Sequence, residues 1–109
     1  NQLIIEGENI RQGINIAEPT EDEIDGTPEI DCDGLVIKGS GTVDVAAIDL
    51  ERDGTFKNMC IQTPNMDGIR VGDGANPTVE DSTINVGGDT FIEDGGSINS
   101  SNIDENGTC

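Results

Sequence analysis

Apolar residues recur in short alternating stretches, and a similar stretch returns roughly every 20 residues between positions 47 and 103. Segments such as Ile48-x-Leu50 and Ile69-x-Val71 alternate apolar and variable positions, which is typical of a strand with one buried face. No apolar set follows the three- and four-residue spacing of a helix. The alignment predicts three inward columns, which are Phe56/Val79/Ile98, Ile61/Ile84/Ile103 and Ile48/Ile69/Thr90.

Turn residues separate the predicted strands. Asp53-Gly54, Pro64-Asn65 and a glycine pair at 95–96 each follow an apolar stretch. A short repeat of this kind buries its apolar face only when neighbouring copies stack on it. We therefore predict an all-β solenoid of about four to five coils, in which three short strands per coil form three parallel sheets.

Four segments resemble the right-handed parallel β-helix of the pectin-lyase-like superfamily. They are 67–71 (DGIRV), 78–84 (TVEDSTI), 56–59 (FKNM) and 35–41 (LVIKGSG). The resemblance implies a right-handed parallel β-helix for the regular coils. It leaves the function open, because this architecture carries lyases, hydrolases, adhesins and viral tailspikes alike.

The domain organisation follows from where the repeat is regular. A chain of 109 residues is expected to form one domain. We predict an irregular edge coil at 1–33 with an acidic surface loop at 17–33, regular coils at 34–103 and a polar tail at 104–109. The loop could face a cation or a partner, although a solvated loop is the simpler interpretation. Because the chain begins without Met, we expect a processed protein or part of a longer one.

The charge of the chain excludes two classes of partner. Its 23 acidic and 5 basic residues give a net charge of −18, which repels nucleic-acid phosphates and anionic lipid. No apolar run approaches the length of a membrane span, so no membrane insertion is expected. The acidic excess suggests a halophilic source, because salt at 1 M screens charges beyond about 3 Å. The alternative is an ordinary acidic surface protein.

No catalytic residue is predicted. The alignment places Asp49, Arg70 and Phe91 in one outward column, and it places Lys57, Glu80 and Asn99 in another. Asp49–Arg70 and Lys57–Glu80 should therefore form lateral ion pairs, which gives both cations a structural role.

Hydrolysis by a carboxylate pair is the best enzymatic alternative. Asp31, Asp33, Asp44 and Asp49 lie close in the sequence, and such chemistry needs two carboxylates about 5–10 Å apart. In a chain with 23 acidic residues, pairs at that distance arise by chance. The related hydrolases also use a histidine, and this chain has none.

Polar residues in the turns have other candidate roles. Asn58, Asp81 and Ser100 share one turn position, so we expect their side chains to turn inward and bond backbone groups along the stack. The calcium candidates are Asp31, Asp33 and Asp73, which lie beside glycine-rich turns; no other cofactor is expected.

Cysteines and sequons bear on the cellular location. Cys32 should point inward and Cys60 outward, and the pairing among Cys32, Cys60 and Cys109 stays open, with one disulfide and one free thiol as one arrangement. Asn99 and Asn106 begin the tripeptides NSS and NGT, which are candidate glycosylation sites.

These observations predict a non-enzymatic structural or adhesive β-helix module of an extracellular, cell-surface or virion-surface protein. As a fibre, spike or spacer, it would bind itself or neighbouring subunits through the ends of its coil stack, because uncapped strand edges invite pairing. Carbohydrate is a further candidate partner. The alternative is a fragment of a polysaccharide lyase or hydrolase, or of a carbohydrate-binding β-helix protein.

Overall fold

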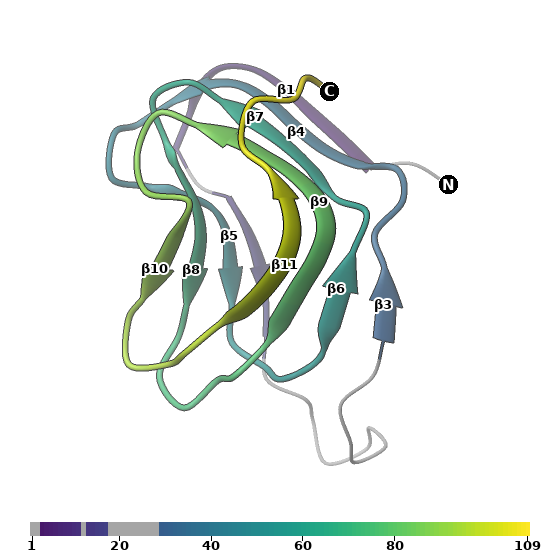
Figure 1. Cartoon of the computed structure of the whole chain (residues 1–109). Coiled ribbons are helices and arrows are strands. Elements are labelled where there is room, and N and C mark those ends of the chain that lie inside the picture. Colours follow the sequence, from purple (N-terminus) through teal and green to yellow (C-terminus); the bar gives the residue numbers. More distant parts are fainter. Residues whose placement is uncertain (1–2, 12, 18–28) are drawn as a thin grey trace.

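In the computed structural model the chain winds into a parallel β-solenoid of about three turns (Figure 1). The structure describes residues 3–11, 13–17 and 29–109, and no helix occurs in these ranges. Their strands are β1 (Leu3–Ile10), β2 (Ile14–Ile16), β3 (Glu29–Asp31), β4 (Leu35–Gly41), β5 (Ala46–Leu50), β6 (Thr55–Lys57), β7 (Cys60–Thr63), β8 (Asp67–Val71), β9 (Thr78–Val86), β10 (Phe91–Glu93) and β11 (Asn99–Asp104).

The number of turns is smaller than the predicted four to five coils. Ile14 pairs with Ile48, whereas Ile48 pairs with Ile69, so the first coil uses many more residues than the next one. Part of the predicted acidic loop is also strand, because Glu29–Asp31 forms β3 and pairs with β6. Residues 18–28 of that loop lie outside the described residues.

Three faces surround the core, but hydrogen bonds join them into two sheets. One sheet has the order β2-β5-β8-β10, and the other follows β1-β4-β7-β9-β6-β3 with β11 also on β9. The second sheet is continuous because β9 turns the corner. Its first part, 78–80, pairs with β6, and its last part, 83–86, pairs with β7. The bend lies at Asp81, whose φ is 52°. The three sheets expected from the repeat are thus three faces of two sheets.

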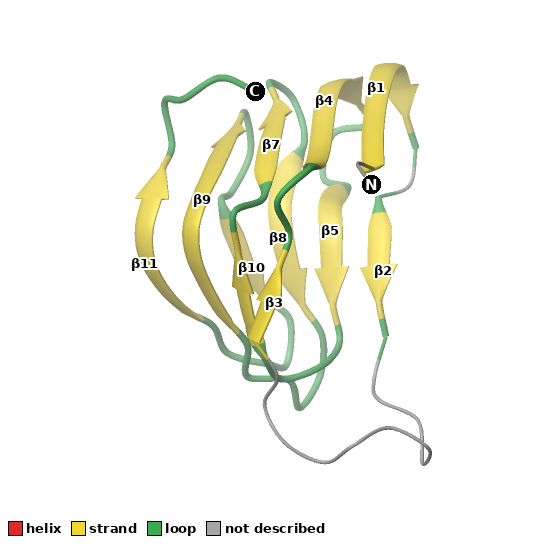
Figure 2. Ribbon diagram, turned by 90° about the vertical axis from the view of Figure 1, so that its right-hand side faces the viewer, coloured by secondary structure: helices red, strands yellow, loops and turns green. Residues whose placement is uncertain are grey.

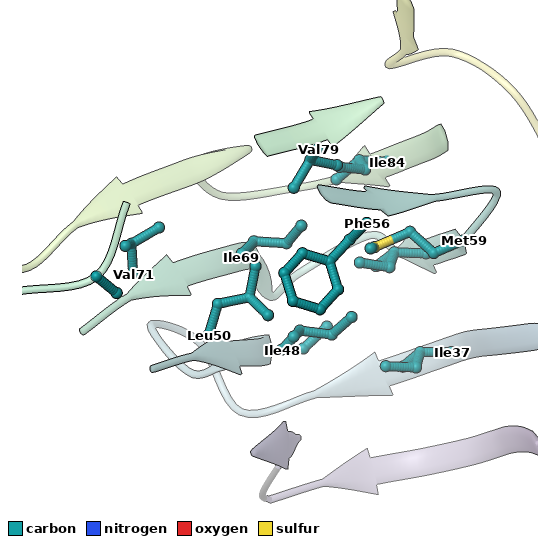
Figure 3. Packing of buried hydrophobic residues seen from close by; sticks show 12 residues of the cluster. Ile37, Ile48, Leu50, Phe56, Met59, Ile69, Val71, Val79 and Ile84 are labelled. Atoms are coloured by element: carbon teal, nitrogen blue, oxygen red, sulfur yellow. The ribbon is translucent and has the colours of Figure 1, made fainter. Parts of the chain in front are cut away.

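The core is a set of inward columns that run along the stack (Figure 3). Phe56 pairs with Val79, Ile61 with Ile84, and Ile48 with Ile69, as the alignment predicts. All six are 0% exposed. Other fully or nearly buried apolar side chains of the cluster are Ile37, Ala47, Leu50, Met59, Val71 and Ala75.

The predicted register of the last coil is wrong by two residues in β11. Ser100, not Ile98, pairs with Val79, and Ile103 pairs with Ser82 instead of Ile84. The same shift places Ser101, not Asn99, beside Glu80, whereas Asn99 pairs with Thr78. The prediction aligned apolar residues, but a terminal coil has solvent on one side and therefore tolerates polar residues in inward columns. Ile98 and Ile103 still pack against the core from their shifted places.

The register of β10 differs from the prediction by one residue. Phe91 pairs with Ile69 and Ile92 with Arg70, so Phe91 does not stand in the outward column of Asp49 and Arg70. Phe91 instead packs against the core, as expected for a large apolar ring. Thr90 precedes the strand, and its carbonyl accepts the N–H of Ile69.

Candidate functional site

The first outward cation is Arg70 on β8. It forms ion pairs with Asp49 on the neighbouring β5 (Nε–Oδ1 3.3 Å) and with Asp94 just after β10 (Nη1–Oδ2 3.7 Å). The predicted Asp49–Arg70 pair is confirmed. The pair with Asp94 was not predicted, because the alignment placed β10 one residue out of register. Arg70 thus links three successive coils.

The second outward cation is Lys57 on β6. Its ammonium lies 2.9 Å from a carboxylate oxygen of Glu29 on β3 and 3.8 Å from one of Glu80 on β9. The predicted pair with Glu80 is confirmed, and the closer pair with Glu29 was missed. The hydrogen bond that Lys57 donates to the Glu29 carboxylate, together with the negative charge of Glu29, raises the pKa of Lys57 above its ordinary value. Lys57 therefore stays charged and links three coils on its face.

The corner between β6 and β7 carries a ladder of polar residues. Asn58, Asp81 and Asn102 have φ angles of 61°, 52° and 53°, a left-handed conformation that Asn and Asp tolerate. Asn102, and not the predicted Ser100, continues the ladder, because β11 is shifted by two residues. The ladder side chains bond other exposed side chains rather than turning inward. The Asn58 amide donates to Asp31 Oδ1 (2.9 Å), and the Asn102 amide donates to Asp81 Oδ1 (2.8 Å).

Other side chains make the side chain–backbone bonds that were expected of the ladder. The buried Ser82 hydroxyl accepts the N–H of Met59 from the preceding coil (3.3 Å). The Asn65 side chain accepts the N–H of Gly41 (2.8 Å), and its amide donates to the Gly41 carbonyl. Pro64-Asn65 indicates a turn in the sequence, but nothing local indicates that Asn65 reaches the coil before it.

The three calcium candidates do not form one site. Asp31 ends β3, and its Oδ1 accepts the N–H of Asp33 (3.0 Å) as well as the Asn58 amide. Asp73 lies in another turn, between β8 and β9, and packs against Gly95, where an added Cβ would lie 2.7 Å from Asp73 Oδ1. No group of three or more metal-ligating side chains occurs within the described ranges. Calcium binding at Asp31, Asp33 or Asp73 stays a prediction.

Replacing Asn58 with Ala should raise the pKa of Asp31 toward its ordinary value of 3.8. The Asn58 amide is the main cause that lowers the pKa of Asp31, followed by the N–H of Asp33. Because the pKa is lowered in the folded state, Asp31 adds stability above pH 3.8, and this contribution is lost as the pH falls through the folded-state value. A carboxyl-carbon NMR titration measures the shift.

Asn102→Ala is the matched control for this titration. It removes the same kind of bond from Asp81, so the pKa of Asp31 should not change. A pKa of Asp31 that is equal in wild type and Asn58→Ala would contradict the assignment.

A disulfide ties the C-terminal segment to the outer face of the second sheet. Cys60 on β7 and Cys109 form it, with a Cα–Cα distance of 5.8 Å and a sequence separation of 49. The outward orientation predicted for Cys60 agrees with this bond. Cys32 is free and packs partly buried against the core, as predicted. Burial raises the pKa of the Cys32 thiol.

The segment after β11, residues 105–109, crosses the strands of three coils; we call it the C-terminal strap. Its contacts follow the outward column Lys38, Gln62 and Asn85, whose members pair in register. The Asn85 amide donates to the Gly107 carbonyl (2.9 Å), Gln62 Oε1 accepts the N–H of Cys109 (3.0 Å), and Lys38 donates to the Cys109 carbonyl (3.3 Å). The predicted polar tail is therefore attached to the sheet.

Both sequon asparagines are exposed. Asn99 lies in β11, and Asn106 lies in the strap, where its N–H donates to Asp104 Oδ1 (2.9 Å). Their hydroxyl partners at the third sequon position, Ser101 and Thr108, are exposed too. Glycosylation of Asn99 and Asn106 stays a prediction.

A shallow hollow of about 340 Å³ lies beside the strap on the outer side of β1, β4 and β7. Two glycines in register are part of its lining. Gly7 and Gly39 pair, both have positive φ, and a Cβ on Gly39 would lie against the Gly7 carbonyl. The residues that line the hollow are Gly7, Glu8, Lys38, Gly39, Ser40, Gln62 and Pro64.

No family model matches this sequence, and no curated protein or solved structure is significantly similar to it. Within the described residues, no helix has the length and apolarity needed to cross a membrane.

Proposed function

We propose that this chain is a non-enzymatic structural or adhesive module of an extracellular, cell-surface or virion-surface assembly, joined to neighbouring subunits through its coil ends. The open coil stack carries this proposal. Among the described residues, β1, β2 and β3 at one end and β10 and β11 at the other end pair on one side only. Unpaired strand edges are templates for further strands, so they favour association along the stack.

The disulfide supports a location outside the cytoplasm. Structural disulfides such as Cys60–Cys109 persist mainly in oxidising compartments and at cell or virion surfaces. The exposed sequon residues Asn99 and Asn106 are compatible with passage through a secretory pathway.

The outward cations support a structural role. Lys57 and Arg70 each lie between carboxylates of neighbouring coils. A general base needs a pKa near the working pH, whereas the pKa of Lys57 is raised above its ordinary value. We therefore propose that these two side chains hold neighbouring coils together and take no part in proton transfer.

Association should depend on protein concentration and on salt. The net charge of −18 opposes contact between copies at low ionic strength, and salt at about 1 M screens charges beyond roughly 3 Å. Sedimentation velocity at several concentrations in 0.1 M and 2 M sodium chloride should show a larger species that gains population at the higher salt. We include a halophilic source in the proposal, and it also predicts that association increases with salt.

Potassium chloride at equal ionic strength is the control for a specific effect of sodium. A species of 11.4 kDa at every concentration and in both salts would contradict association through the coil ends.

A carbohydrate-binding or polysaccharide-processing protein is the second candidate, and the hollow beside the strap favours it. Glu8 and Ser40 offer hydrogen-bonding groups on this open and mostly apolar surface, beside Lys38 and Gln62, which also bond the strap. The sequence resemblance to the right-handed β-helix of the pectin-lyase-like superfamily also favours this candidate. The parallel coils of the structure support that resemblance. Calorimetric titration with neutral oligosaccharides separates binding in the hollow from a purely structural role.

A further inference from the structure

The first coil of the solenoid ends in a layer of isoleucines. Each lies in register with a core residue of the next coil that is 0% exposed. The pairs are Ile5–Ile37, Ile14–Ile48, Ile16–Leu50 and Ile30–Phe56. The four isoleucines themselves are only partly buried, although they pack against the core. The residues of these inward columns are thus apolar up to the N-terminal end of the stack.

The last coil differs in these same columns. Glu93 pairs with Val71 and Ser100 pairs with Val79, and both polar residues are exposed. Phe91 is apolar and continues the column of Ile69. Terminal repeats of solenoids carry polar residues on their outer side, because that side meets water. The last coil therefore has polar residues in two of these inward columns, whereas the first coil has isoleucine in all four.

Among the described residues, the strand edges at the N-terminal end are unpaired as well. Figure 2 shows β1 and β2 along one side of the stack and β11 along the other. Within the described residues, β1, β2 and β3 each pair with a single strand, so one backbone edge of each is unpaired. Apolar side chains and unpaired edges thus occur together at this end.

We propose that this N-terminal end, formed by β1, β2 and β3 with Ile5, Ile14, Ile16 and Ile30, binds the same end of a second copy of the chain. The product is a closed dimer with two-fold symmetry, in which the polar last coils lie outside. This inference rests on the proposed association through coil ends, and it names the end and the symmetry.

Polarity decides between this dimer and a head-to-tail fibre. In a fibre, Glu93 and Ser100 of one copy would face the isoleucines of the next, and a buried carboxylate without a partner is costly. In the two-fold dimer, isoleucine faces isoleucine, and one self-complementary surface serves both copies.

The size of the end is sufficient for a specific dimer. The molecule measures 37 × 27 × 24 Å, so a section across it spans on the order of the two shorter extents. Two such faces remove on the order of 1,000 Å² from water, which is near the lower bound for a specific interface. Dimer formation should also require high salt, since salt screens the repulsion between the charges of −18 on the two copies.

The test compares two variants that add the same charge at opposite ends of the stack. Ile30→Glu changes the N-terminal end, and Ser100→Glu changes the last coil. In 2 M sodium chloride, sedimentation equilibrium should show that the wild type and Ser100→Glu are both dimers. The dissociation constant of the Ile30→Glu dimer should be at least about tenfold larger than that of the wild type.

Hydrogen exchange of the wild type gives the same information if Ile30→Glu does not fold. As concentration rises, amides of β1, β2 and β3 should gain protection, and those of β10 and β11 should not. Species that grow beyond a dimer, new protection at β10 or β11, or loss of the dimer in Ser100→Glu would overturn the inference while leaving association through coil ends standing. A monomer under all conditions would overturn both.

Discussion

Replacing Cys60 with Ser should lower the free energy of unfolding by about 4 kcal/mol, as estimated from chain entropy for a closed loop of this length. The disulfide joins residues 49 positions apart and thereby restricts the unfolded chain. Its loss also releases the strap, whose bonds to Lys38 and Gln62 depend on the position of Cys109. For a domain of this size, the midpoint of thermal unfolding should fall by on the order of 15 °C or more.

Three comparisons isolate the disulfide in a denaturant titration. Cys109→Ser should equal Cys60→Ser, and wild type treated with a dithiol should approach both. Cys32→Ser is the matched control, because Cys32 is free, and it should cost about 1 kcal/mol or less. Equal losses for Cys32→Ser and Cys60→Ser would contradict a structural disulfide between Cys60 and Cys109.

Phe56→Ala should lower the free energy of unfolding by about 3–5 kcal/mol. Phe56 is 0% exposed and lies in register between Ile30 of the first coil and Val79 of the third. Figure 3 shows Phe56 among the buried side chains of the core. Its removal leaves a cavity in the middle of the stack, where neighbouring strands are held by hydrogen bonds on both sides and cannot collapse into the space.

The chain contains a second phenylalanine that serves as the control. Phe91 is partly exposed in the last coil, so Phe91→Ala removes the same atoms with a smaller loss, about 1–2 kcal/mol. Both variants should be compared by urea unfolding with the wild-type m-value as a check on the denatured state. An equal or larger loss for Phe91→Ala would contradict the assignment of Phe56 to the centre of the core.

The two ends of the molecule have different proposed roles. The strap and the polar residues Glu93 and Ser100 belong to the C-terminal end, where a disulfide holds the last residues on the sheet. The isoleucines belong to the N-terminal end, where strand edges are unpaired among the described residues. Under the two proposals, this asymmetry predicts a module that binds a second copy through its N-terminal end.

The register of the interior coils could be predicted from the sequence alone. Phe56–Val79 and Ile48–Ile69 pair as expected, and the predicted Asp49–Arg70 ion pair forms. The physical reason is local. Period-two alternation sets which side of a strand is buried, turn residues set where it ends, and an interior coil must place apolar residues over those of both neighbours.

Only the tertiary structure determines the register of the last coil, the pairing of the cysteines and the difference between the two ends. A terminal coil needs apolar residues on one side only, so Ile98 and Ile103 misled the alignment, and the backbone corner at Asn102 sets the register instead. The pairing of Cys60 with Cys109 depends on a distance across 49 residues, which no local pattern encodes. The sequence predicted association through the coil ends, but only the register shows that isoleucines fill the inward columns at one end and polar residues enter them at the other.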